Sequence, residues 1–399
     1  MKFNSQKFVE EQTKEIGKTL GDERALVAVS GGVDSTTCAA LIHRAIGENL
    51  LCVMLDDAFM RKEEPERVAR LVSQPPLQLP IKILNVQERF LNALEGLQDA
   101  EEKRKAFRET FYNSLRATAE AEGCRFLVQG TIAADIVETT EGVKTQHNVL
   151  TQIGINPIKS FGVQVIEPLK SLYKEQVREV ARYLGVPSEI SERQPFPGPG
   201  LSVRVVGEIE ADKLEMLKKA TAIAEEELAK SPPSQFFAAV IENAERPLHS
   251  QLADLPEILG GILDVLPDYV FVKVFRDKAT GVKEGHRLYG DILAIKAEGE
   301  DEHILEVPIK SLVGLQARIV EENPSFSRVL YAISETGKKQ AYTIIVRAVE
   351  TVDFLTASVA DVSWRCLERI ANRVIGSCPT VSGVYYDVTP KPPATIEFE

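Results

Sequence analysis

Leu26-Val-Ala-Val-Ser-Gly-Gly-Val-Asp-Ser35 is the stretch of sequence that decides the fold. Its apolar first half ends at two adjacent glycines, and a segment with helical character, Thr36 to Ile46, follows directly. This order predicts a strand, a tight loop and a helix. Glycine lacks a Cβ and lets the backbone approach a ligand closely, and the first amides of a helix lie at the positive end of its dipole. The loop is therefore predicted to bind phosphate.

The carboxylate of Asp34 stands inside this predicted phosphate site. The loop lacks the Gly-Lys-Ser/Thr ending of a Walker A loop, and Asp34 would repel phosphate unless a cation such as Mg²⁺ bridged the two. Asp34 is therefore predicted to hold a metal ion. The alternative is an ordinary turn between strand and helix, in which the glycines serve geometry alone and Ser35 caps the helix. The complete string Ser-Gly-Gly-Val-Asp-Ser resembles the PP-loop of the ATP pyrophosphatases, which cleave ATP between its α- and β-phosphates.

The length and charge of the chain limit its class. A chain of 399 residues is long enough for two or three domains. With 47 basic and 59 acidic residues its net charge is -12, which argues against a general nucleic-acid binder. No apolar run approaches the roughly 20 residues of a membrane span, and the start lacks the apolar core of a signal peptide. A cytoplasmic protein is expected. The five cysteines are scattered singly and are predicted to be buried free thiols.

Short apolar runs alternate with helical segments through the first half of the chain. The runs are residues 26–29, 50–55, 81–86, 126–129 and 163–166. Continuous apolar strands that alternate with helices predict an α/β domain with a parallel sheet covered on both faces. Ligands bind outside the carboxyl ends of such strands. Asp56-Asp57 and Gly130-Thr131 both stand at such ends.

A Pro-rich segment, Gln194-Pro-Phe-Pro-Gly-Pro-Gly200, interrupts this pattern. Three prolines and two glycines in seven residues cannot form a regular element. The phenylalanine among them indicates a shaped hinge or lid. A domain boundary is predicted here, with a first domain over residues 1–205 and a second over residues 206–399.

Several strings stand in this chain in a fixed order. They are Ser-Gly-Gly-Val-Asp-Ser, Glu-Glu-Lys-Arg-Lys, Gln-Gly-Thr-Ile, Glu-Pro-Leu-Lys, Pro-Phe-Pro-Gly-Pro-Gly-Leu and the final Lys391-Pro-Pro-Ala-Thr-Ile-Glu-Phe-Glu399. Together they resemble the synthetase part of the GMP synthases. The resemblance implies a PP-loop domain followed by an α+β dimerisation-type domain. No glutamine amidotransferase domain precedes the PP-loop, so the chain resembles the separate synthetase subunit of the two-subunit enzymes.

The resemblance implies an ATP-dependent amination. Enzymes of this family adenylate xanthosine monophosphate with ATP, release pyrophosphate, and let ammonia from a glutamine amidotransferase displace AMP to give GMP. No protein nucleophile is needed, so catalysis depends on holding the acceptor oxygen in line with the α-phosphate and on neutralising the departing pyrophosphate. Two other functions stay open. One is a PP-loop relative that adenylates a different acceptor, and the other is a non-catalytic, nucleotide-binding regulatory subunit.

The resemblance also assigns residues to roles. Those that bind the ATP phosphates are Ser30, Gly31, Gly32, Val33, Asp34, Ser35 and Thr36, and those that line the nucleotide pocket are Gly130 and Thr131. Asp34, Ser35 and Lys170 are assigned to catalysis, with Asp34 as the Mg²⁺ ligand. Those that bind the substrate are Arg104, Gln235, Lys391 and Glu397. From the residues alone, Arg104 lies in a charged helix whose face is expected to be solvated. Gln235 is also open to another interpretation, as an edge-strand glutamine that faces water.

Three stretches depart from the family's pattern near its substrate contacts. Glu284-Gly285-His286 replaces a Gly-Asp pair whose aspartate contacts substrate in the family. Asp56-Asp57-Ala58 replaces Asp-Thr/Asn-Gly after the second strand, and Thr145-Gln-His-Asn-Val149 replaces Ser-His-His-Asn-Val. These departures indicate either a tuned affinity or a different acceptor.

The second half contains an internal repeat, over about residues 275–332 and 338–399. Tyr289-Gly-Asp-Ile and Pro324-Ser-Phe-Ser are echoed by Tyr342-Thr-Ile-Ile and Pro379-Thr-Val-Ser. An offset of about 50 residues predicts a duplicated strand–helix–strand unit. Short members of the family carry one such unit as a dimerisation domain, so the chain is expected to be a homodimer or a pseudo-dimeric monomer.

Overall fold

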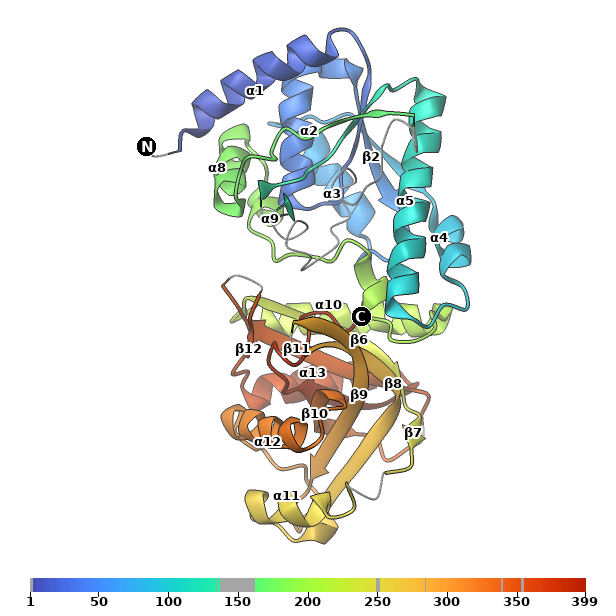
Figure 1. Cartoon of the computed structure of the whole chain (residues 1–399), viewed down its shortest axis with the longest axis vertical. Coiled ribbons are helices and arrows are strands. Elements are labelled where there is room, and N and C mark those ends of the chain that lie inside the picture. The colour runs from blue at the N-terminus through green and yellow to red at the C-terminus, as the bar shows by residue number, and fades with distance from the viewer. Residues whose placement is uncertain are drawn as a thin grey trace. The chain divides into compact units, whose positions relative to one another are not determined.

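The computed structural model describes residues 3–133, 135–136, 162–248, 252–283, 285–338, 340–352 and 355–399. The chain forms two compact units, one of Met1–Ala93 with Lys105–Gly198 and one of Leu94–Arg104 with Pro199–Glu399 (Figure 1). The second unit therefore takes in residues 199–205, which the sequence had grouped with the first domain. Val205 forms a β-bridge with Val240, and the amide of Val206 donates to the Val240 carbonyl, so this stretch folds with the second unit.

The first unit is a five-stranded sheet with helices on both faces. Its elements are α1 (Ser5–Leu20), β1 (Ala25–Ala28), α2 (Val33–Ile46), β2 (Leu50–Asp56), α3 (Glu64–Ser73), β3 (Ile81–Asn85), α4 (Gln87–Leu94), α5 (Ala100–Glu122), β4 (Phe126–Val128), β5 (Gln164–Ile166), α8 (Lys174–Leu184) and α9 (Ser188–Ser191). The strand order is β3-β2-β1-β4-β5, and every pair is parallel. The predicted α/β fold with a parallel sheet is confirmed.

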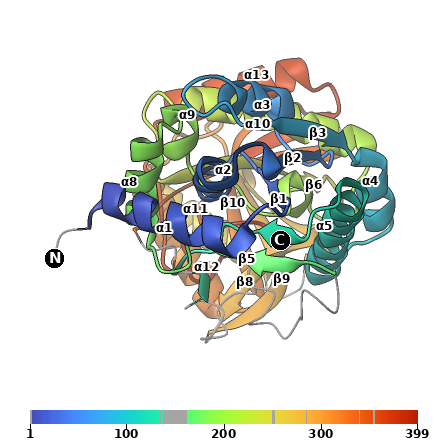
Figure 2. The same ribbon diagram turned by 90° about the horizontal axis from the view of Figure 1, so that it is seen from above.

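Alternation of side chains along the strands explains why both faces of this sheet are covered. Val27 and Cys52 belong to a core that includes residues of α1, α2, α3 and α8, whereas Leu26 and Val53 belong to a core that includes residues of α5. Accordingly, α1, α2 and α8 lie together on one side of the sheet and α5 on the other (Figure 2). A parallel sheet covered in this way leaves the carboxyl ends of its strands as the place where a ligand can bind.

The loop after β2 contains a backbone departure at Ala58. Its φ is +74°, in the left-handed region that favours glycine. For a residue with a Cβ this conformation costs roughly 1 kcal/mol relative to glycine. Ala58 stands where the pattern that the sequence resembles has glycine, and its backbone has the left-handed shape that glycine favours.

The second unit is built on an eight-stranded mixed sheet. Its elements are η2 (Gly200–Val203), α10 (Ala211–Leu228), β6 (Gln235–Glu242), β7 (Glu245–Arg246), α11 (Leu255–Leu263), η4 (Pro267–Tyr269), β8 (Val270–Lys283), β9 (His286–Ala297), α12 (Ile309–Glu322), β10 (Phe326–Glu335), β11 (Tyr342–Glu350), β12 (Ser358–Val359), α13 (Trp364–Ser377) and β13 (Val381–Asp387). The order is β12-β11-β13-β10-β9-β8-β7, and β6 pairs with β11.

Two strand–helix–strand segments meet at the centre of this sheet. In one, α12 connects the parallel strands β9 and β10, and in the other α13 connects the parallel strands β11 and β13. The two segments join through an antiparallel pairing of β10 with β13, in which Tyr331 lies opposite Tyr386. The sheet thus has the layout of two similar halves side by side.

Two expectations concern the chain as a whole. In the described residues, no helix has both the length and the apolar character that crossing a bilayer requires. The prediction of buried free thiols is confirmed for all the cysteines, namely Cys38, Cys52, Cys124, Cys366 and Cys378.

Candidate functional site

The loop between β1 and α2 is closed by the hydroxyl of Ser35. The Ser30 amide donates to Ser35 Oγ at 3.1 Å, and Ser35 Oγ donates to the Gly32 carbonyl at 3.2 Å. Thr36 Oγ1 also donates to the Gly32 carbonyl, at 2.9 Å. Gly32 is the N-cap of α2 and receives no side-chain cap. The alternative interpretation required Ser35 to cap the helix. Ser35 does not do so; its hydroxyl instead holds the two ends of the loop together.

Two glycines give this loop its shape. Gly31 has a φ of +78°, and a Cβ there would lie 2.8 Å from Val68 Cγ2 in α3. Gly130, directly after β4 and Gln129, packs on the start of α2, because a Cβ on it would lie 3.0 Å from the Ser35 amide nitrogen. The structure thus brings Gly130 against the loop.

The other predicted residues at this edge lie after β4 and β5. Thr131 is fully buried, and its Oγ1 donates to Glu167 Oε1 at 2.7 Å. Lys170 lies in the turn that follows Glu167, with its side chain exposed. Of the predicted residues at this edge, Gly130 lies against the loop, and a lysine that was not predicted bonds to Asp34 within it.

That lysine is Lys174, the first residue of α8. Its Nζ lies 2.7 Å and 3.0 Å from the two carboxylate oxygens of Asp34. Both side chains are only partly buried. The sequence showed Lys174 as one of several basic residues on a helix, and nothing in that pattern distinguished it. The contact crosses 140 positions of the chain.

Asp34 fits a magnesium ligand on the chemistry of the site. A cationic group already meets its carboxylate, which shows that a positive charge is accommodated beside the loop. Within the described ranges no cluster of three or more His, Cys, Asp or Glu side chains could hold a metal ion. Mg²⁺ is commonly held by one or two carboxylates together with the phosphates of a substrate. A single carboxylate beside a phosphate-binding loop suits that mode.

Asp57 is a buried acid at the carboxyl end of β2. Its Oδ1 accepts from the Phe59 amide at 2.8 Å. Burial raises the pKa of Asp57 to about 7, against the opposing effect of that hydrogen bond. At neutral pH this carboxyl is therefore only partly ionised, which limits the negative charge that it brings to the edge where β1 and β2 end.

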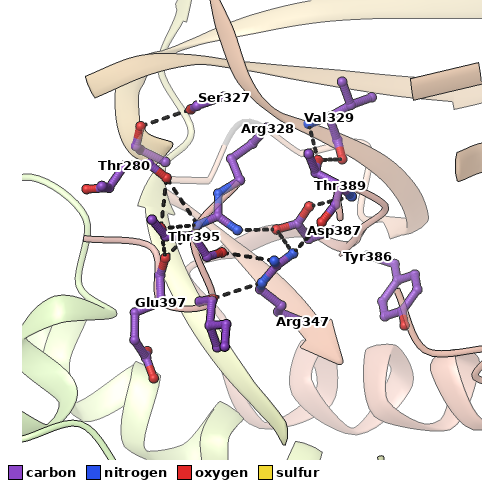
Figure 3. Close-up of polar contacts among 12 residues, drawn as sticks. Thr280, Ser327, Arg328, Val329, Arg347, Tyr386, Asp387, Thr389, Thr395 and Glu397 are labelled. Carbon is purple, nitrogen blue, oxygen red and sulfur yellow. Dashed lines mark hydrogen bonds and ion pairs between the residues drawn. The ribbon is translucent and has the colours of Figure 1, made fainter. Parts of the chain in front are cut away.

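A buried charge network fixes the last residues of the chain in the second unit. Arg328, Arg347 and Asp387 are fully buried, with Asp387 Oδ2 at 2.9 Å and 2.7 Å from Nη1 of the two arginines (Figure 3). Other guanidinium donors reach backbone carbonyls, of Thr280 and Glu397 for Arg328 Nη2 and of Thr389, Thr395 and Ile396 for Arg347, whereas Arg328 Nε is buried without a hydrogen-bond partner among the described residues. Burial, with Arg347 beside it, lowers the pKa of Arg328 to about 9. We call residues 388–399 the tail.

The tail brings two predicted substrate residues into one neighbourhood. Glu397 accepts two hydrogen bonds from Arg204, at 2.8 Å and 2.9 Å, and Arg204 in turn lies 4.0 Å over the ring of Phe237. Arg104 donates to the carbonyl of Glu399. Arg204 was not among the predicted residues, although it stands close after the Pro-rich segment.

The interpretation of the segment around Arg104 as a solvated helix face is wrong for Lys103 and Arg104. Lys103 is fully buried and ion-paired with Glu399, and its Nζ also donates to the carbonyls of Val205 at 2.8 Å and Gly207 at 2.9 Å. Arg104 beside it is mostly buried. The charged pattern failed as a guide because the partners lie in the tail, far along the chain.

Two further predicted residues lie in the second unit. Gln235, the first residue of β6, is buried, which contradicts the water-facing alternative. Lys391 is fixed through its backbone, by hydrogen bonds with Ala357 in both directions. Of the departures from the family pattern, the stretch Thr145–Val149 and Glu284 lie outside the described residues.

Comparisons with known proteins find two family models and several relatives of similar length. Residues 4–205 match the family model described as NAD synthase, and residues 335–398 match the one described as GMP synthase C terminal domain. One subunit of the glutamine-hydrolyzing GMP synthase of Sulfurisphaera tokodaii is 42% identical over 401 residues, covering 100% of both chains. The corresponding subunits of Saccharolobus solfataricus, at 41% over 398 residues, and Methanopyrus kandleri, at 40% over 404 residues, also match over 100% of both chains.

Gly31→Ala should destabilise the first unit more than the same change at its neighbour. The new Cβ would meet Val68 and force a left-handed φ, whereas a Cβ on Gly32 would meet only Ser30 Oγ at 3.4 Å. We expect a loss of roughly 1–3 kcal/mol for Gly31→Ala, seen in calorimetry as a lower unfolding temperature. Gly32→Ala is the matched control and should change the unfolding temperature little. Equal effects of the two substitutions would contradict this description of the loop.

Proposed function

Because the chain belongs to the same family as these glutamine-hydrolyzing GMP synthase subunits, we propose that it catalyses the ATP-dependent amination of xanthosine monophosphate to GMP. The acceptor is adenylated first, with release of pyrophosphate, and ammonia from a separate glutamine amidotransferase subunit then displaces AMP. The observation that carries this proposal is the loop between β1 and α2, closed by Ser35 and carrying Asp34 at the start of a helix.

The residues of the loop bind and orient the triphosphate. The amides from Ser30 to Thr36 and the N-terminus of α2 supply donors for phosphate oxygens. Asp34 would hold Mg²⁺, which would supply positive charge to offset the charge of the phosphates. Gly130 leaves room for ATP to pass close to the start of α2. The pocket is completed by Thr131, Ser35 and Lys170. Lys174 balances the charge of Asp34 at 2.7 Å.

The second unit supplies contacts to the acceptor nucleotide. The Glu397 carboxylate can accept hydrogen bonds from purine N–H groups, and the Lys391 ammonium suits a phosphate. Arg104 and Gln235 are the remaining substrate contacts. Glu397 is held in place by two hydrogen bonds from Arg204, so its orientation is set before the substrate arrives.

The second candidate function is the adenylation of a different acceptor. The replacement of the family's Gly-Asp pair by Glu284-Gly285-His286 favours it, because the lost aspartate contacts substrate in the family. The intact Lys391 and Glu397 in the tail oppose it.

Pyrophosphate release tests the proposal. The protein is incubated with MgATP and ammonium, with and without xanthosine monophosphate, and Asp34→Asn is compared with Asp22→Asn, the same change at an exposed position outside the loop. We expect release that requires xanthosine monophosphate and that falls at least about 100-fold in Asp34→Asn, because the phosphates lose their bridging cation. Release without xanthosine monophosphate would indicate another acceptor, and absence of ATP binding would indicate the regulatory alternative. Normal activity of Asp34→Asn would remove Asp34 from the metal site.

We propose further that one chain supplies the two halves that short family members bring together by dimerisation. The support is the antiparallel pairing of β10 with β13 at the centre of the sheet, which joins two strand–helix–strand segments of one chain. The protein alone should then sediment as a monomer at micromolar concentration. A tight dimer in sedimentation velocity would contradict this proposal and favour the homodimer.

A further inference from the structure

A buried carboxylate lies behind the PP-loop. Glu64 is the first residue of α3, and only 4% of it is exposed. A Cβ built on Gly31 would lie 3.6 Å from Glu64 Oε1, so the carboxylate stands directly against the backbone of the loop. An uncompensated negative charge at this place would oppose the binding of a triphosphate, because two charges separated by low-dielectric protein interact strongly. The loop therefore requires that Glu64 be neutralised.

Protonation does not neutralise it. Burial raises the pKa of Glu64, but the guanidinium groups of Arg61 and Arg193 lower it by more, and the result lies below the ordinary value for a glutamate. Glu64 is thus ionised at neutral pH. Its charge has to be balanced by neighbouring cations.

Two arginines from separate segments provide this balance. Arg193 Nη1 lies 2.5 Å from Glu64 Oε1, the oxygen nearest the loop, and Arg61 Nη1 lies 3.5 Å from Oε2. The Arg61 amide also donates to Oε2, at 3.2 Å. Arg61 belongs to the loop between β2 and α3, and Arg193 follows α9. Two guanidiniums therefore meet one carboxylate beside a phosphate-binding loop.

The same arginines connect the loop to the start of the Pro-rich segment. The Arg61 guanidinium lies 4.1 Å from the centre of the Phe196 ring, and Arg193 precedes this segment directly. The first part of the segment, up to Gly198, belongs to the first unit. Glu64 thus anchors the residues that carry the segment, which explains why a carboxylate stands at a place that a phosphate-binding loop would otherwise avoid.

We propose that Arg193, with Arg61, is a positioning residue that shields the nucleotide's phosphates from Glu64 and so sets the affinity of the loop for ATP. The inference rests on the proposed binding of ATP at this loop. It assigns a role to residues outside the loop that the sequence motif does not include. Arg193 acts through Glu64 and touches no reacting atom.

A double-mutant cycle tests the proposal. Binding of MgATP to the full chain is measured by calorimetry, without acceptor or ammonium, for the wild type, Arg193→Gln, Glu64→Gln and the double variant. Arg193→Gln should weaken MgATP binding about tenfold, because Glu64 is left facing the phosphates with Arg61 alone. The double variant should recover to within about threefold of the wild type, because the charge to be shielded is gone. A merely structural role for Arg193 would not produce this rescue.

Two controls keep the result interpretable. Glu192→Gln removes the exposed ion pair of Glu192 with Arg182 next to the same site and should leave MgATP binding unchanged. Arg193→Lys keeps the charge and should stay within about threefold of the wild type. Thermal unfolding of each variant shows whether it is folded, and Arg61→Gln, with the same expected weakening and rescue, replaces Arg193→Gln if that variant is not.

Three outcomes would overturn the proposal. Arg193→Gln binds MgATP like the wild type, or the double variant binds no better than Arg193→Gln, or the wild type does not bind MgATP. In the first two cases GMP formation by the wild type is unaffected, so the shielding role of Arg193 fails while the proposed function stands. In the third the proposed function fails with it. Binding without GMP formation would overturn the function and leave the shielding role standing.

Discussion

The second unit depends on a single carboxylate placed between two buried guanidiniums. Asp387 balances one positive charge of Arg328 and Arg347, and most of the other donors of the two arginines bond to backbone carbonyls. Burying such donors without partners costs several kcal/mol. Most of the carbonyls that satisfy them belong to the tail, so the tail has one conformation in which the buried charges are tolerated. Phe398, which is fully buried in the sheet core with its ring 4.4 Å from Arg328, adds an apolar contact to the same arrangement.

This constraint extends to the residues proposed to bind the acceptor. Glu397 and Glu399 alternate with Phe398, so that one apolar side chain enters the core and the two acids lie toward Arg204, Lys103 and Arg104. A buried ion pair adds little to stability by itself, but it makes alternative arrangements costly because each would leave a charge unpaired. The tail residue proposed to bind the acceptor, Glu397, is therefore positioned by Arg204, to which no substrate contact is assigned.

The first unit positions its loop by shape as well as by charge. Gly31 and Gly130 allow close approach, Ser35 closes the loop, and the carboxylates around it meet cationic side chains, with Lys174 at Asp34 and two arginines at Glu64. In both units the residue at the proposed site is accompanied by an oppositely charged residue from a distant part of the chain. Each of these carboxylates therefore has a cationic partner before a ligand binds.

The sequence predicted the parts of this structure that depend on local pattern. Apolar runs and glycine spacing were sufficient for the parallel sheet, the loop and the place of Gly130, because each follows from the order of neighbouring residues. Lys174, Arg204 and Lys103 were missed, since their roles arise from contacts across more than a hundred positions. A charged helix resembles a solvated one until its partner is known, which is why the segment around Arg104 was misjudged.

Hydrogen exchange of the tail tests most directly the claim that buried charge positions the acceptor site. The amides of Lys391, Ala394 and Glu399 are hydrogen-bonded in the structure, to the carbonyls of Ala357, Pro390 and Val203. In Asp387→Asn these three amides should exchange at least about tenfold faster than in the wild type, while the amides of β1 in the first unit keep wild-type rates. In an Asp361→Asn control the same three tail amides should also keep wild-type rates. Wild-type protection of the tail in Asp387→Asn would show that the tail is held without this carboxylate, and would contradict the account.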